Sequence, residues 1–297
     1  MSKLNFLARF LRSCWSTVDS ARRITVNLLF LIISVGILAV ILQRDEPEVE
    51  NGSALLIAPR GVLVEQLTEK QFEEALQDEI SGVTDQETLL KDVVDAITAA
   101  SVDDRFEVMV LNLDDFAGAR LTKLQDVAQA LDAFRAKGKK IIAVADNYAM
   151  SGYYLAAHAD EVLLHKMGAV IIEGMSRYRM YHREGIEKLG LDINIFKVGT
   201  YKSAVEPFLL DGMSDAAREA NEEWVGDLWR QYLFEVGEAT GLGAYAIDRY
   251  AQQFDTVLAD ANGDAAKAAL DMGLVDQILT RVEMREYLAK VVGEDKE

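Results

Sequence analysis

The chain has 297 residues, a formal net charge of −18 and a single cysteine, Cys14. The first 44 residues carry six Lys or Arg and one Asp, so residues 45–297 have a net charge of −23. This acidic surface argues against nucleic acid as a partner, because it repels the phosphate backbone. Disulfides are excluded after Cys14, and the three scattered histidines show no metal-ligand spacing, so neither a metal nor an organic cofactor is implied.

An uncharged run of nineteen residues, Ile24–Leu42, predicts a membrane-spanning helix. At 1.5 Å per residue it would be about 29 Å long, close to the roughly 30 Å thickness of the hydrocarbon layer. A cleaved signal peptide is the alternative, but this run is longer than the usual ~7–15 residues. Basic residues precede the run and acidic residues follow it, which predicts a cytoplasmic N-terminus. We expect a basic segment at 1–23, an anchor at 24–43 and a linker at 44–53.

The chain after the anchor alternates between strand and helix periodicity. Strands are predicted at 54–58, 62–64, 107–113, 140–145, 161–165, 170–172 and 192–198. Helices are predicted at 89–100, 121–136, 153–158 and 178–189, and a loop at 114–119. Strands separated by helices of this length indicate right-handed crossovers onto a mainly parallel sheet. The predicted fold class is therefore α/β.

The last third of the chain is predicted to be mostly helical. A long helix opens at Ser214, the predicted N-cap, and runs to about Ala239. We interpret Trp224 and Trp229 on this helix as core or subunit contacts rather than as ligand-binding residues. A helix at 263–270, a strand at 274–279, a helix at 282–292 and a charged tail at 293–297 complete the prediction.

Four stretches of the chain together resemble one family. They are Gly199-Thr-Tyr-Lys-Ser-Ala-Val-Glu-Pro-Phe208, Asp211-Gly-Met-Ser-Asp-Ala-Ala-Arg-Glu-Ala220, the helix with Trp224 and Trp229, and Val144 to Tyr153-Tyr-Leu-Ala156. They are similar to signal peptide peptidase A, a family of membrane-anchored bacterial serine proteases with a ClpP/crotonase-type fold of repeated ββα units. The likeness covers about residues 50–290, and we expect a peptidase-like domain at 54–292. The likeness is closer to the long form of this family than to the short form. The chain matches only the first half of the long form.

The resemblance implies a general base. In the long form, the first half supplies a lysine base, the second half supplies a serine in an Ala-Ser-Gly-Gly-Tyr turn, and the protomers form a tetramer. Lys202 matches the lysine. A lysine with the ordinary pKa of about 10.4 is protonated at pH 7, so a lysine base needs an apolar setting. Suitable neighbours in the sequence are Phe196, Val198, Ala204, Val205, Pro207 and Phe208. A solvated loop lysine, or a charged lysine paired with Glu206, is the structural alternative.

The nucleophile position departs from the family pattern. Aligning Tyr153-Tyr154 with the aromatic residues after Ala-Ser-Gly-Gly puts Met150 on the serine and Ser151 on the following glycine. A thioether cannot attack a peptide bond, and one helical step turns a side chain by about 100°. We therefore interpret Ser151 as an N-cap rather than a nucleophile. The 114–119 loop takes the place of the family's oxyanion loop, where Gly118 would keep the shape without the function.

With the predicted anchor, the resemblance implies a membrane-anchored serine endopeptidase that degrades cleaved signal peptides and other small hydrophobic peptides. This chain would supply Lys202, and a second half or chain would supply the serine. The expected location is the bacterial inner (cytoplasmic) membrane, with a single span and the main domain on the periplasmic or external side. Two alternatives stay open, namely a short-form enzyme that uses Ser151 and a non-catalytic membrane scaffold with the same fold.

Overall fold

The protein divides into two compact units, residues 1–49 and 50–297, in a computed structural model. The structure describes residues 2–42, 49–69 and 86–293. Residues 44–48 of the predicted linker and 294–297 of the predicted tail lie outside the described residues.

The first unit contains one long helix, α1 (Ser2–Leu42). Its segment Val18–Leu38 is long and apolar enough to cross a membrane. The acidic residue of that segment, Asp19, forms ion pairs at 2.8 Å with Arg22 and Arg23. The charges at the start of the segment are thus paired, and its remaining residues are uncharged, as expected for a membrane anchor.

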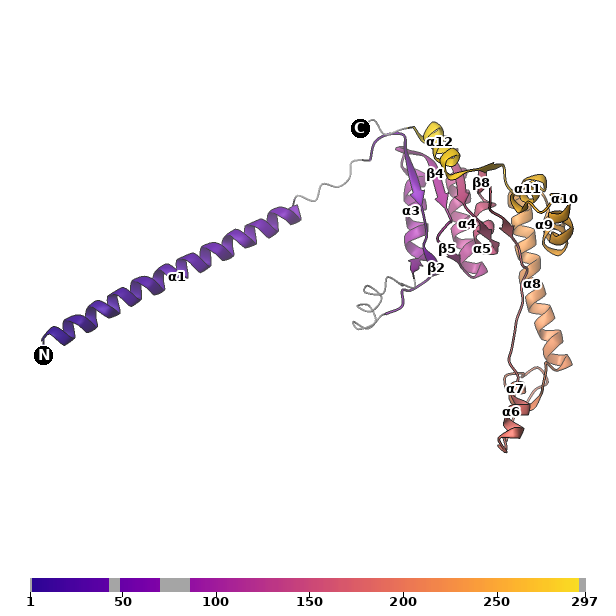
Figure 1. Cartoon of the computed structure of the whole chain (residues 1–297), viewed down its shortest axis with the longest axis horizontal. Coiled ribbons are helices and arrows are strands. Elements are labelled where there is room, and N and C mark those ends of the chain that lie inside the picture. The colour runs from indigo at the N-terminus through magenta and orange to yellow at the C-terminus, as the bar shows by residue number, and fades with distance from the viewer. Residues whose placement is uncertain (1, 43–48, 70–85, 294–297) are drawn as a thin grey trace. The chain divides into compact units, whose positions relative to one another are not determined.

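Five parallel strands form the main sheet of the second unit, in the order β1-β4-β6-β8-β10. Their bounds are β1 (Ser53–Ile57), β4 (Phe106–Asn112), β6 (Lys140–Ala145), β8 (Glu161–His165) and β10 (Gln277–Leu279). Figure 1 labels β4 and β8 of this sheet. The predicted α/β class with a mainly parallel sheet is confirmed. Strands β6 and β8 have the predicted bounds, and β4 is shifted by one residue.

The sheet is buried on both faces at its centre. Ile141 and Ala143 of β6 pack into the main core on one face, whereas Ile142 and Val144 pack into a smaller core on the other. This two-sided burial explains why β6 is a continuous apolar run in the sequence. Helices α3 (Leu90–Val102) and α4 (Leu121–Arg135) contribute to the main core, and α12 (Arg281–Val292) covers the smaller core through Met284.

Two smaller parallel sheets lie in the same unit. One has the order β3-β2-β5 and the other pairs β7 with β9. Their bounds are β2 (Gly61–Val64), β3 (Glu87–Leu89), β5 (Phe116–Gly118), β7 (Tyr148–Ala149) and β9 (Val170–Ile171). The prediction of a loop throughout 114–119 is wrong, because β5 forms there by pairing with β2. A strand of three residues is too short to show a periodicity in the sequence.

Helices dominate the C-terminal part. They are α8 (Asp215–Thr240), α9 (Ala244–Gln252), α10 (Phe254–Asp260) and α11 (Ala265–Asp271). Ser214 caps α8 as predicted, because its hydroxyl accepts a hydrogen bond from the Ala217 amide. Gly237 is required where α8 meets the start of α9, since a Cβ there would lie 2.4 Å from the Ala244 nitrogen. Trp229 stacks on Tyr232 at the edge of the core, in agreement with a packing role.

Residues 173–213 form an arm that first runs beside α8 and then extends beyond its N-terminal end, where two short helices lie (Figure 1). These are α6 (Arg183–Lys188) and α7 (Glu206–Leu209). The helix predicted at 178–189 is therefore shorter than expected, and the strand predicted at 192–198 is not formed. A strand requires a partner for its backbone hydrogen bonds, and within the described residues none lies beside this segment.

Candidate active site

Ser151, near the start of α5 (Met150–Ala156), lies beside Gly118 at the end of β5. The helix is capped by Ala149 without a side-chain hydrogen bond, so the prediction that Ser151 is the N-cap is wrong. Ser151 lies in the first turn, and its hydroxyl donates a hydrogen bond of 3.3 Å to the Ala119 carbonyl. Gly118 has a φ of +121°, and a Cβ there would lie 3.2 Å from Ser151 Oγ. The structure therefore brings these two predicted residues together and leaves little space between them.

Met150 occupies the position that the resemblance assigns to the nucleophile. Its side chain packs against the main core, and its carbonyl accepts a hydrogen bond of 3.1 Å from the Tyr232 hydroxyl. The next two aromatic residues of α5 also have structural partners. Tyr153 donates to the Leu274 carbonyl and Tyr154 donates to a carboxylate oxygen of Glu235. Burial raises the pKa of both phenols, so they remain neutral donors that fix α5 to the helical region.

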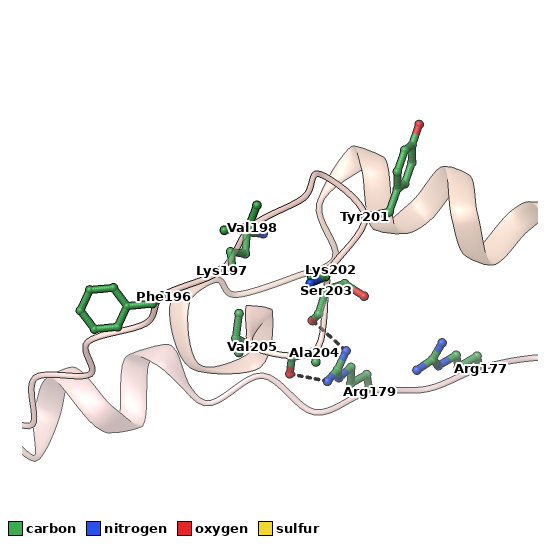
Figure 2. A pocket seen from close by; sticks show the side chains of 10 residues that line it. All are labelled: Arg177, Arg179, Phe196, Lys197, Val198, Tyr201, Lys202, Ser203, Ala204 and Val205. Atoms are coloured by element: carbon green, nitrogen blue, oxygen red, sulfur yellow. Dashed lines mark hydrogen bonds between the residues drawn. The ribbon is translucent and has the colours of Figure 1, made fainter.

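Lys202 lies in the arm, in the turn that follows Gly199. Gly199 has a φ of +109°, a conformation that favours glycine, and the aliphatic part of Lys202 packs over it. Lys202 lines a cavity of about 520 Å³ together with the other nine residues shown in Figure 2. Within the described residues, no side chain forms a hydrogen bond or ion pair with Lys202. Ion pairing with a carboxylate, which would hold a lysine in its charged form, is therefore not seen for Lys202 among the described residues.

The apolar residues expected around Lys202 are placed unevenly. Phe196 is 99% exposed and Val198 is 84% exposed, although both line the same cavity. Pro207 is buried, and Phe208 is 43% exposed. Phe196 and Val198 therefore do not shield Lys202 within this chain, contrary to the expectation from the sequence.

Glu206 does not pair with Lys202, which was one of the structural alternatives. Its side chain is buried, accepts a hydrogen bond of 2.6 Å from the Ser214 hydroxyl and lies 4.0 Å from the Lys197 ammonium group. These contacts tie the end of the Lys202 loop to its beginning and to the N-cap of α8. The carboxylate thus has a structural role.

Two arginines near Lys202 were not identified from the sequence. Arg179 donates to the Ser203 carbonyl at 3.0 Å and to the Ala204 carbonyl at 2.7 Å, both drawn as dashed lines in Figure 2. Arg177 instead donates to the Asn221 side chain at 2.8 Å and lies over the Trp224 ring. The partners of Arg179 are 24 and 25 residues away, so the sequence offers no local signal for these contacts.

Lys202 and Ser151 are in different parts of the second unit. Ser151 is on α5, beside the main core, whereas Lys202 is in the loop between α6 and α7 at the far end of the arm (Figure 1). They do not form a dyad within this chain. The part of the chain that the structure describes also contains no group of three His, Cys, Asp or Glu side chains able to hold a metal ion.

Comparison with solved structures gives similarity to enzymes of two kinds. One is an enoyl-CoA hydratase from Mycobacterium avium subsp. paratuberculosis K-10, with a TM-score of 0.37, 14% identity, and coverage of 69% of this chain and 68% of that chain. The other is the 1510-N membrane-bound stomatin-specific protease, with a TM-score of 0.43, 12% identity, and coverage of 81% of this chain and 84% of that chain.

Comparison with protein sequences is more specific. The chain is 35% identical over 297 residues to Protease 4 of Salmonella typhi, covering 98% of this chain and 48% of that protein. It is 33% identical over 288 residues to Protease 4 of Haemophilus influenzae, covering 95% of this chain and 47% of that protein. It thus spans about half the length of these curated relatives. The sequence model of peptidase family S49 matches residues 133–292. This range is more than half of the chain and contains Lys202. The chain belongs to peptidase family S49.

Proposed function

We propose that this chain is the lysine-bearing half of a membrane-anchored serine peptidase, with Lys202 as the general base. The observation that carries the proposal is the setting of Lys202, which has no partner among the described residues and lines a cavity with exposed apolar side chains. Membership of peptidase family S49 supports a peptide bond as the bond that is cleaved. The proposed substrates are cleaved signal peptides and other small hydrophobic peptides, as the family resemblance implies.

In the proposed mechanism, a second half or chain supplies the serine. The neutral amine of Lys202 takes the proton of the serine hydroxyl as its oxygen attacks the peptide carbonyl. The resulting ammonium group then gives the proton to the leaving amine, the role that a histidine plays in other serine proteases. Docking of the second body onto the arm would cover Phe196 and Val198 and remove water from around Lys202, which favours the neutral amine.

The same exposed side chains support the proposal that protomers associate, as the resemblance to a tetrameric family implies. Large apolar residues left in solvent on one arm are unusual in a monomeric domain. They include Tyr178, Met180, Leu189, Phe196 and Val198. We infer that the arm is an assembly surface as well as the support of Lys202.

Replacement of Lys202 tests the proposed function. In an assembly that carries both this chain and the nucleophilic serine, Lys202→Ala should abolish cleavage of a fluorogenic hydrophobic peptide. Lys202→Arg should be equally inactive, because a guanidinium group stays protonated and cannot accept the serine proton. Thermal unfolding measured alongside should be unchanged, since Lys202 is exposed. Activity of Lys202→Arg within about tenfold of wild type would mean that Lys202 is not the base, and absence of any cleavage by the wild-type assembly would favour the scaffold alternative.

A further inference from the structure

The loop that carries Lys202 has little regular structure of its own. Residues 200–201 and 204–205 form turns, and between them the Ser203 amide donates to the Tyr201 carbonyl. At the ends of the loop, Lys197 and Glu206 form the 4.0 Å ion pair described above. Such a loop gives a long side chain many positions unless another element holds its backbone.

Arg179 provides that hold from a separate segment of the arm. Its two terminal nitrogens bind the carbonyls of Ser203 and Ala204, the two residues that directly follow Lys202 (Figure 2). A guanidinium group is planar and presents its donors in a fixed fork, so two hydrogen bonds to consecutive carbonyls fix the backbone in position and in orientation. Arg179 is partly buried, and its bond to the Ser203 carbonyl is partly shielded from water, whereas its bond to the Ala204 carbonyl is exposed.

We propose that Arg179 is the positioning residue for Lys202, an inference that rests on the proposed function. A general base must come within about 2.6–3.2 Å of the hydroxyl whose proton it takes. A displacement of about 1 Å lowers the rate of a positioned reaction by roughly 100-fold. Because both terminal nitrogens of Arg179 are occupied by the loop backbone, Arg179 acts through Lys202 and not on the peptide.

Arg177 is a matched control. It is the same residue type, lies two positions away and lines the same cavity, but it contacts Asn221 and Trp224 instead of the loop. Loss of positive charge in the cavity is therefore common to Arg177→Ala and Arg179→Ala, whereas loss of the two loop hydrogen bonds is specific to Arg179→Ala.

The kinetic experiment compares these variants in the anchored assembly that carries both Lys202 and the serine. Arg179→Ala should lower kcat for a fluorogenic hydrophobic peptide by about tenfold or more and change KM by less than about twofold, because ground-state binding is untouched. Arg179→Lys should remain impaired, since one ammonium group does not reproduce the fork. Added guanidinium ion should restore part of kcat in Arg179→Ala only. An Arg179→Ala variant with raised KM and normal kcat, or an equal loss in Arg177→Ala, would overturn the proposal.

Hydrogen exchange provides a readout that does not depend on activity. Amides of residues 200–206 should exchange at least about tenfold faster in Arg179→Ala than in wild type, and at the wild-type rate in Arg177→Ala. The midpoint of thermal unfolding should be unchanged in both variants, because the arm after Met175 adds no buried residue to the two cores. Unchanged amide exchange in Arg179→Ala would overturn the proposal about Arg179, whether or not the wild-type assembly cleaves the peptide. Absence of cleavage by the wild-type assembly would count against the proposed function alone.

Discussion

Ser151 lies one residue from the position where the family resemblance places a nucleophile, and its contacts argue against nucleophilic attack. Its hydroxyl proton is directed at the Ala119 carbonyl, and a side chain at position 118 would crowd the oxygen. A serine becomes a strong nucleophile when an adjacent base takes up its proton, and a backbone carbonyl is too weak a base to do so. The short-form alternative therefore finds little support at this residue.

We expect that the chain by itself, purified in detergent, will not react with a fluorophosphonate probe, which labels activated serines. Labelling that disappears in Ser151→Ala would contradict this expectation and favour the short-form enzyme. Ser203→Ala is the control, because Ser203 is the serine directly next to Lys202. Labelling lost only in that variant would place the reactive serine in the arm.

Site residues were predictable from the sequence only where a motif marks them. The run around Lys202 is such a motif. Ser151 was identified because the aromatic residues Tyr153 and Tyr154 fix an alignment, and Gly118 because the 114–119 loop takes the place of the family's oxyanion loop. The hydrogen bonds of Arg179 depend on how the arm folds back on itself, and no local pattern encodes them. The exposure of Phe196 was also unpredictable from the sequence. An apolar residue type favours burial but does not show whether its own chain provides the contacts.

At the scale of elements, α12 has an N-terminus stabilised by charge. Thr280 and Glu283 form a capping box in which each side chain binds the backbone amide of the other. The Lys166 ammonium group binds Glu283 and, together with the hydrogen bonds from Thr280, lowers the pKa of that carboxyl group to about 2. Since α12 covers the smaller core, this cap holds one side of the main sheet.

The stability contribution of Glu283 should depend on pH. Its folded pKa is below its unfolded value of about 4.3, so the contribution is complete above about pH 4.3 and is lost as the pH falls towards 2. We expect Glu283→Gln to lower the free energy of unfolding at pH 7, and the difference from wild type to shrink between about pH 4.3 and 2. Urea unfolding at several pH values measures this. Glu286→Gln, at an exposed position of the same helix, is the control, and a difference that is constant with pH would contradict the assignment.

Elements were predictable where their stability is local or their burial is two-sided. The buried strands β6 and β8 and the capped helix α8 follow their sequence patterns closely. The strand expected at 192–198 has the right composition but no neighbouring strand, and composition alone cannot supply one. Strands β3, β5 and β7 have at most three residues each, too few to establish an alternation.

For the whole molecule, the exposed side chains of the arm predict association. Replacing Phe196 and Val198 together by Asp should weaken assembly, because burial of each apolar side chain contributes about 1.5–3 kcal/mol. Each should therefore raise the dissociation constant by roughly tenfold or more. Mass photometry in detergent would measure the shift towards smaller species. Met167→Asp, at an 89% exposed position outside the arm, is the control, and an equal shift in that variant would argue against the arm as the surface.

The topology of the whole chain is a second prediction at this scale. Arg22 and Arg23 precede the uncharged part of the anchor, and acidic residues follow it. Positive flanks remain in the cytoplasm, so a reporter that is active only outside the cytoplasm should be active when fused after Glu297. Replacing the basic residues before the span by acidic ones, and the acidic residues after it by basic ones, should reduce that activity. An inactive fusion with the natural flanks would reverse the proposed orientation.

The last strand of the main sheet also has a consequence for the timing of folding. The Val162 amide binds the side chain of Asp276, which is 114 positions later in the chain and next to β10. At roughly 5–20 residues per second, a ribosome needs about 6–23 s to synthesise that interval. During this time β8 has no β10 beside it, and its open edge can pair with other unpaired strands. The proposed export requires the nascent chain to cross the membrane unfolded. The sheet is then completed only after residues 277–279 have reached the far side.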